Sequence, residues 1–307
     1  MKKPVKPEKL KRGDCVGVVA PAGCVEPKQL ERGIRVIEKM GLKPILGKYV
    51  CSRHRYFAGT DRERSEDLMA MFKDERIKGI FCARGGYGAD RVIPHLKLAI
   101  IRKNPKIFVG SSDITLLLLH LSRKCSLVTF HGPMVAGSFG CQPMIQSRKQ
   151  FKEILTRKQT GKKLFSSKIR VVQPGRVKAE LTGGCLTLLC RSLKTSGEID
   201  TRNRILLIED VNEPLYRIDG MLWQLKKAGK FKQIKGIIFG EMIDCRAGKH
   251  GGNMKDIILE VFEGLDIPIL THAPIGHGKE MWTVPFGIEG TLDSKSRSLT
   301  LDHCGVI

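Results

Sequence analysis

Residues 107–121 read IFVGSSDITLLLLHL, and this stretch decides which fold the chain adopts. Three apolar residues, typical of a buried strand, lead through the turn 110–113 into an apolar helix. A serine at such a sharp turn exposes its hydroxyl beside the unpaired N–H groups of the helix. The pattern is not G-x-S-x-G, and two interpretations of Ser112 stay open: a nucleophile, or only the N-cap of the helix.

Apolar strands and amphipathic helices alternate around this stretch. Residues 14–20, 77–82 and 128–130 are expected to form buried strands, and 26–40 and 62–73 to form helices. This alternation predicts an α/β fold with a doubly wound, mostly parallel sheet and helices on both faces. Sites in such folds form at the carboxyl ends of strands, which here are followed by ARGGYG, GSSD and HGP.

A polar and basic segment interrupts the alternation and divides the chain. We predict an N-terminal α/β domain over residues 1–155, a linker over 156–169, and a smaller C-terminal α/β domain over 170–307. The candidate nucleophile lies in the first domain. Residues 282–288 are expected to help close the second domain as a strand.

Acidic and histidine side chains follow strands of the second domain. Glu209 ends an apolar run and is a candidate partner for a histidine, with Glu213 as a further candidate. His277 lies between two glycines after a strand, where an imidazole is accessible and titrates near neutral pH. Its rivals are His131, His272 and His120, of which His120 is expected to pack in its leucine-rich helix.

Ser112, Glu209 and His277 therefore occur in that order along the chain. Catalytic triads recur in several chain orders, because the geometry of the three side chains carries the chemistry. Since the serine lies in the first domain and the other two residues lie in the second, we expect the site in the cleft between them.

The composition limits which binding partners and which cellular compartment are expected for this chain. The formal net charge of +23 suits nucleic acid, but the cations are spread along the chain and aromatics make up only 6%. The ten cysteines form no C-x-x-C pair and no zinc spacing, which predicts reduced thiols, no metal and a cytoplasmic location. No apolar run approaches the roughly 18 residues that span a bilayer, so no membrane partner is expected.

Motifs in one fixed order resemble the LD-carboxypeptidase family of serine peptidases, which includes muramoyltetrapeptide carboxypeptidases and microcin C self-immunity peptidases. The resemblance covers nearly the whole chain. The motifs are GDCVGVVAPAG (13–23), FAGTDRERSEDL (57–68), ARGGYGADR (83–91), GSSDIT (110–115), HGPM (131–134), LTGGCL (181–186), LLIEDVNEPLYRID (206–219) and HGKEMWTVPFG (277–287).

The resemblance implies a role for each site residue. Ser112 would be the nucleophile, His277 the general base and then the general acid, and Glu209 the group that orients the histidine. The backbone N–H groups of Gly86 and Asp113 would form the oxyanion hole. The resemblance also implies a homodimer, and a reaction that needs no metal or cofactor.

The substrate that the resemblance implies is a small peptide, the murein tetrapeptide of cell-wall recycling. The bond cut would join the L-centre of a diamino acid to the terminal D-alanine. The free carboxylate of such a peptide suits a bidentate arginine, for which Arg84 and Arg246 are the candidates. Two positions depart from the family: Ser111 replaces an aromatic residue, and Cys185 replaces an asparagine.

Three other functions stay open at this point. The same fold and triad could cleave a peptidyl-nucleotide antibiotic of the microcin C type and so confer self-immunity. A basic nucleic-acid-binding protein could use the glycine turns for phosphate. In a fourth hypothesis, Cys82 is the nucleophile at the end of its strand.

Overall fold

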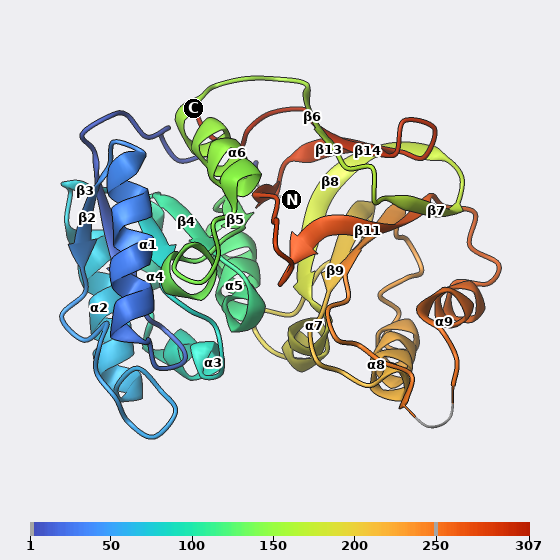
Figure 1. Cartoon of the computed structure of the whole chain (residues 1–307), viewed down its shortest axis with the longest axis horizontal. Coiled ribbons are helices and arrows are strands. Elements are labelled where there is room, and N and C mark those ends of the chain that lie inside the picture. The colour runs from blue at the N-terminus through green and yellow to red at the C-terminus, as the bar shows by residue number, and fades with distance from the viewer. Residues whose placement is uncertain (1–2, 249–250) are drawn as a thin grey trace.

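Two sheets side by side organise the computed structural model, which describes residues 3–248 and 251–307 (Figure 1). The first sheet has six strands within the described residues, in the order β12-β5-β4-β3-β1-β2. Their bounds are β1 (Cys15–Val19), β2 (Lys43–Leu46), β3 (Ile77–Cys82), β4 (Ile107–Gly110), β5 (Thr129–His131) and β12 (Val284–Phe286). β1 to β5 run parallel and β12 runs antiparallel to β5, as the predicted doubly wound fold requires.

Amphipathic helices cover the first sheet. α1 buries Leu30, Val36 and Ile37, and Thr60 and Glu63 form a capping box at the start of α2. The helices of this half are α1 (Pro27–Lys39), α2 (Asp61–Lys73), α3 (Ala89–Val92), α4 (Leu98–Lys103), α5 (Thr115–Cys125) and α6 (Ile145–Thr156). The chain therefore builds the strand-turn-helix of residues 107–121 as β4, a short 3₁₀ turn over Ser112–Ile114, and α5.

The second sheet has eight strands in the described part of the chain, in the order β6-β14-β13-β8-β9-β10-β11-β7. The central strands β8 to β11 are parallel, and the strands at both edges are antiparallel. The bounds are β6 (Lys162–Phe165), β7 (Arg170–Gln173), β8 (Arg176–Cys185), β9 (Arg204–Glu209), β10 (Gly236–Glu241), β11 (Ile269–Gly276), β13 (Glu289–Asp293) and β14 (Ser298–Leu301), with helices α7 (Leu186–Ser192), α8 (Leu215–Lys227) and α9 (Met254–Val261).

Two segments differ from the sequence expectation. The segment predicted as a linker contains β6, which pairs with β14 at the edge of the second sheet. The strand expected within residues 282–288 does not close the second sheet; as β12 it returns to the first sheet and covers the edge of β5. The expectation failed because strands near each other in sequence usually share a sheet, whereas the open edge of β5 needed a partner.

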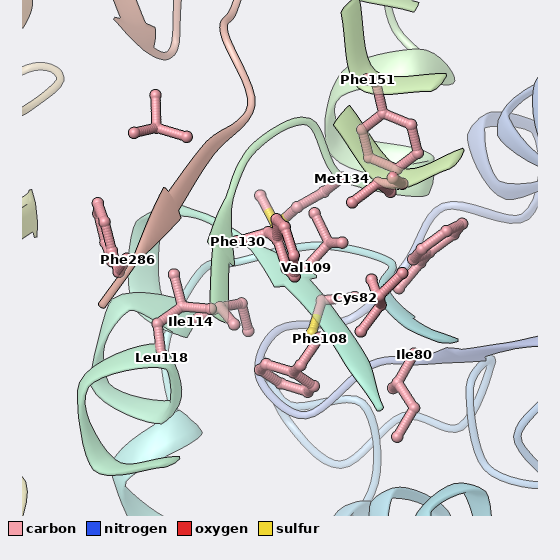
Figure 2. Packing of buried hydrophobic residues seen from close by; sticks show 14 of the residues in the cluster. Ile80, Cys82, Phe108, Val109, Ile114, Leu118, Phe130, Met134, Phe151 and Phe286 are labelled. Carbon is pink, nitrogen blue, oxygen red and sulfur yellow. The ribbon is translucent and has the colours of Figure 1, made fainter. Parts of the chain in front are cut away.

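The core of the first half lies against the strands that lead to the site. Figure 2 shows Phe108 and Val109 of β4 packed with Cys82 of β3 and Phe130 of β5, and all four are buried. This packing fixes the carboxyl ends of β3, β4 and β5 beside one another. In residues 3–248 and 251–307, no helix is long and apolar enough to cross a bilayer.

Candidate active site

The turn after β4 presents Ser112 in a strained backbone conformation. Its φ is +57°, in the left-handed region that residues other than glycine, asparagine and aspartate rarely adopt. Ser111, at φ −154°, is extended and buried, whereas Ser112 is partly exposed. Neither serine side chain caps the helix, so the N-cap interpretation of Ser112 is wrong.

The glycine turn after β3 lies directly against Ser112. A Cβ added to Gly85 would stand 2.8 Å from Ser112 Oγ and 3.3 Å from the backbone nitrogen of Asp113. Gly86 has a φ of +102°, and no acceptor among the described residues takes its N–H. The turn therefore brings Gly85 against Ser112 and the backbone nitrogen of Asp113, and Gly86 follows directly in the chain.

The side chain of Asp113 ties the serine turn to the glycine turn. Its Oδ2 accepts a hydrogen bond from the backbone N–H of Ala89 at 2.7 Å. Burial raises the pKa of the Asp113 carboxyl to about 6. The charge is therefore costly at this position, and the hydrogen bond from Ala89 partly offsets that cost.

Glu209 and His277 meet at the carboxyl edge of the second sheet. Glu209 ends β9, His277 follows β11, and Nδ1 of the histidine lies 2.8 Å from Oε2 of the carboxylate. Gly240 on the intervening strand and Gly276 leave room for this contact, because a Cβ on either would approach Glu209 Cβ to about 3 Å. The contact has the geometry by which a carboxylate can orient an imidazole.

Electrostatic interactions favour the ionised carboxylate of Glu209 and the protonated imidazole of His277. Burial alone would raise the pKa of Glu209, but His131 and His277 outweigh it and lower that pKa to about 2. Burial acts to lower the pKa of His277, yet the hydrogen bond and charge of Glu209 outweigh it and raise the pKa. The two shifts keep Glu209 ionised near neutral pH and favour the protonated form of His277.

A third group, His131, approaches the other side of the same carboxylate. Its Nε2 lies 3.7 Å from Glu209 Oε1, and both side chains are fully buried. In the sequence, His131 is recognisable only as a rival of His277. The signal that could have revealed the contact is its place in HGP at the end of a strand next to β4.

The remaining candidates lie apart from these contacts. Arg84 donates to the carbonyl oxygen of Cys24 at 2.7 Å, and the exposed Arg246 pairs with Asp244 at 2.9 Å. Cys82 is wholly buried, and burial raises the pKa of its thiol, which excludes it as a nucleophile. Cys185, the second departure from the family, is also buried, and its N–H donates to Thr115 Oγ1 at 3.2 Å.

Among the described residues, no hydrogen bond joins Ser112 Oγ to His277, whose side chain is one quarter exposed. Hydrogen bonds of this kind are often loose without substrate and tighten when it binds. No group of three His, Cys, Asp or Glu side chains in residues 3–248 and 251–307 could hold a metal ion.

Comparison with known proteins identifies the family. Residues 16–132 match the model of the LD-carboxypeptidase N-terminal domain, and residues 178–292 match that of the LD-carboxypeptidase C-terminal domain. The chain belongs to the LD-carboxypeptidase family. This LD-carboxypeptidase is accordingly a serine-type hydrolase of peptide bonds, as the sequence motifs predicted.

Relatives of this LD-carboxypeptidase carry names from two functions. A probable murein peptide carboxypeptidase of Bacillus subtilis is 36% identical over 97% of this chain and 94% of its own length. The crystal structure of muramoyltetrapeptide carboxypeptidase from Oxalobacter formigenes is 30% identical, covers 94% of this chain and 99% of its own, and superposes with a TM-score of 0.84. The structure of the microcin C7 self-immunity protein MccF in complex with aspartyl sulfamoyl adenosine is 26% identical to this chain. It covers 99% of this chain and 100% of its own, and it superposes with a TM-score of 0.91.

Proposed function

We propose that this LD-carboxypeptidase removes the terminal D-alanine from murein tetrapeptides in cell-wall recycling, through a triad of Ser112, His277 and Glu209. The observation that carries the proposal is the 2.8 Å contact between His277 Nδ1 and Glu209 Oε2. It leaves Nε2 of the imidazole free to act on the strained, partly exposed Ser112. The name of the B. subtilis relative supports the substrate class.

Acylation would begin with attack of Ser112 Oγ on the carbonyl carbon of the L-centre, while His277 Nε2 takes the hydroxyl proton. The N–H groups of Gly86 and Asp113 would hold the developing oxyanion. Collapse of the tetrahedral intermediate breaks the C–N bond, and His277 returns the proton to the leaving amine of D-alanine. The shortened peptide then remains as an ester on Ser112.

Deacylation would repeat the sequence with water as the nucleophile. His277 takes a proton from water, the hydroxide attacks the ester, and the proton returns to Ser112 Oγ as the shortened peptide leaves. Glu209 stabilises the imidazolium in both halves of the reaction, since its low pKa keeps it ionised. For the terminal carboxylate of the substrate we keep Arg84 and Arg246 as candidates; Arg84 precedes the Gly85 that abuts Ser112.

We place this activity in the cytoplasm, in a homodimer that acts on free peptides rather than on nucleic acid or membranes. A second candidate function uses the same triad on a peptidyl-nucleotide antibiotic of the microcin C type. The observation that favours it is the TM-score of 0.91 to MccF, over almost all of both chains. The two functions differ in what lies beyond the scissile bond, a D-alanine or a nucleotide.

The decisive experiment compares two substrates with purified wild type and Ser112→Ala. We expect the wild type to release D-alanine from a murein tetrapeptide, and Ser112→Ala to release none. Turnover of an aminoacyl-sulfamoyl adenylate, without release of D-alanine, would replace the first function by the second. Equal release by wild type and Ser112→Ala would remove Ser112 from the mechanism and point to Ser111.

A further inference from the structure

His131 is held in the sheet that carries Ser112. Its backbone pairs with Gly110 of β4 on one side and with Val284 of β12 on the other. The N–H of the following residue, Gly132, donates to the carbonyl oxygen of Gly110 at 3.1 Å. The position of His131 is therefore fixed relative to the turn that begins after Gly110 and presents Ser112.

The side chain of His131 crosses to the second half of the molecule. Its Nε2 reaches 3.7 Å from Glu209 Oε1, and neither side chain has any exposure to solvent. Phe286 stacks on the ring, with centroids 5.7 Å apart and an interplanar angle of 27°. Among the described residues, neither nitrogen of the ring nor Glu209 Oε1 has a hydrogen-bond partner.

Glu209 thus has two imidazoles, one on each oxygen, and no Lys or Arg forms an ion pair with it in the described chain. A buried carboxylate needs such partners, because its charge is poorly solvated in the interior. His277 comes from the same sheet as Glu209, whereas His131 comes from the sheet of the nucleophile. The contact with His131 is hence a direct link between the two halves of the proposed triad.

We infer that His131 is a positioning residue, which holds Oε1 of Glu209 and thereby sets Glu209 and His277 relative to Ser112. The inference rests on the proposed triad and adds a fourth member to it. The contact that joins His131 to the proposed triad is the one with Glu209, and His131 acts through that carboxylate. A buried histidine with a merely structural role would stabilise the fold without affecting the titration of His277.

A matched control exists in the same half of the molecule. His120 of α5 is also buried, and its Nδ1 lies 3.5 Å from Ser196 Oγ rather than near a carboxylate. His120→Leu therefore tests the loss of a buried imidazole outside the site. His131→Leu removes the contact with Glu209, His131→Gln keeps an N–H donor near the place of Nε2, and His131→Asn keeps a polar group too short to reach it.

The first measurement is the pKa of His277, by NMR of the full-length protein with labelled histidines and no substrate. In His131→Leu, the charge of Glu209 is compensated by His277 alone, which favours the protonated imidazole. We expect the pKa of His277 to rise by about one unit. His131→Asn should show the same rise, and His131→Gln and His120→Leu should show none.

Other titratable groups near Glu209 and His277 also influence the pKa of His277. Asp210 comes directly after the end of β9, Cys185 ends β8, and Cys245 lies beyond β10. Each interacts electrostatically with Glu209 or His277. Burial raises the pKa values of the Cys185 and Cys245 thiols and of Asp210. None of these groups is altered by the variants, so a change in the pKa of His277 reports the loss of His131.

The second measurement is the rate of D-alanine release. We expect His131→Leu to lower kcat by roughly 10- to 100-fold with little change in KM, as loss of a residue that orients a catalytic group does. Glutamine should restore most of the rate. An unchanged pKa of His277 and an unchanged kcat in folded His131→Leu would overturn the inference.

Two safeguards keep the outcomes separate. If His131→Leu does not fold, the comparison of His131→Gln with His131→Asn decides, because equal pKa values of His277 in those two variants would also overturn the inference. If the wild type releases no D-alanine, the proposed function fails. The NMR titration still tests the link between His131 and Glu209, since it uses no substrate.

Discussion

The two halves of the molecule position the residues of the candidate site by different physical means. The first half places Ser112 by backbone conformation, with a positive φ at the serine and glycines where side chains would collide. The second half prepares Glu209 and His277 by burial and charge, through a 2.8 Å contact and opposite pKa shifts. The proposed nucleophile, Ser112, thus depends on close backbone packing, and the proposed acid–base pair depends on the charge of a buried carboxylate.

The largest effect is expected from Ser112→Ala in the first half of the molecule. We expect D-alanine release to fall by about 10⁶-fold, the scale on which loss of a triad nucleophile acts. The fold should be kept, because the substitution only shortens a partly exposed side chain. Ser111→Ala is the control, and its kcat should stay within a few-fold of wild type.

The matching substitution in the second half of the molecule is Glu209→Gln, which removes the negative charge beside His277. We expect kcat to fall by about 10⁴-fold, as in triads whose acid is replaced by an amide. Loss of the negative charge also lowers the pKa of His277, so the acid limb of the remaining activity should move to lower pH. A limb that stays in place would show that Glu209 does not act on His277.

A smaller effect is expected when one methyl group enters the glycine turn. Gly85→Ala would place Cβ within 3 Å of Ser112, and a displacement of about 1 Å at a reacting group costs roughly 100-fold in rate. Gly220→Ala, in α8 with open space around it, is the control for the same substitution. It should leave the rate unchanged and raise the free energy of unfolding by about 0.5–1 kcal/mol.

The mildest test perturbs only the proton concentration. His277 must be neutral to act as a base, and its pKa is raised above 6.5. We therefore expect the acid limb of kcat/KM to have its midpoint above pH 6.5, while Glu209 stays ionised. Asp113, whose pKa is about 6, titrates nearby. If Asp113→Asn moves the limb, the limb belongs to Asp113 rather than to His277.

Local patterns in the sequence predicted the first half better than the links between the halves. The strand, turn and helix of residues 107–121 form as predicted, because neighbouring residues determine them. The family and the α/β fold followed from motifs spread along the chain. The sequence did not reveal the positive φ of Ser112, because the same residues fit an N-cap as well as a strained turn.

Contacts between distant segments were the main omissions. The return of Val284–Phe286 to the first sheet and the approach of His131 to Glu209 join residues far apart in the chain. No periodicity or spacing encodes such a pairing. The strand-end rule placed His131 at the correct edge of its sheet, but only the docking of the two halves showed which carboxylate it faces.

The pairing of β12 with β5 has a consequence for the order in which the chain is made. Translation delivers Thr129–His131 long before Val284–Phe286, so the edge of β5 stays open on the ribosome. By the time its partner strand emerges, Glu209 and His277 have already been synthesised. A prematurely terminated chain that contains Ser112 would therefore expose an unpaired sheet edge, and we expect it to be cleared by proteases or to aggregate rather than to fold as an autonomous fragment.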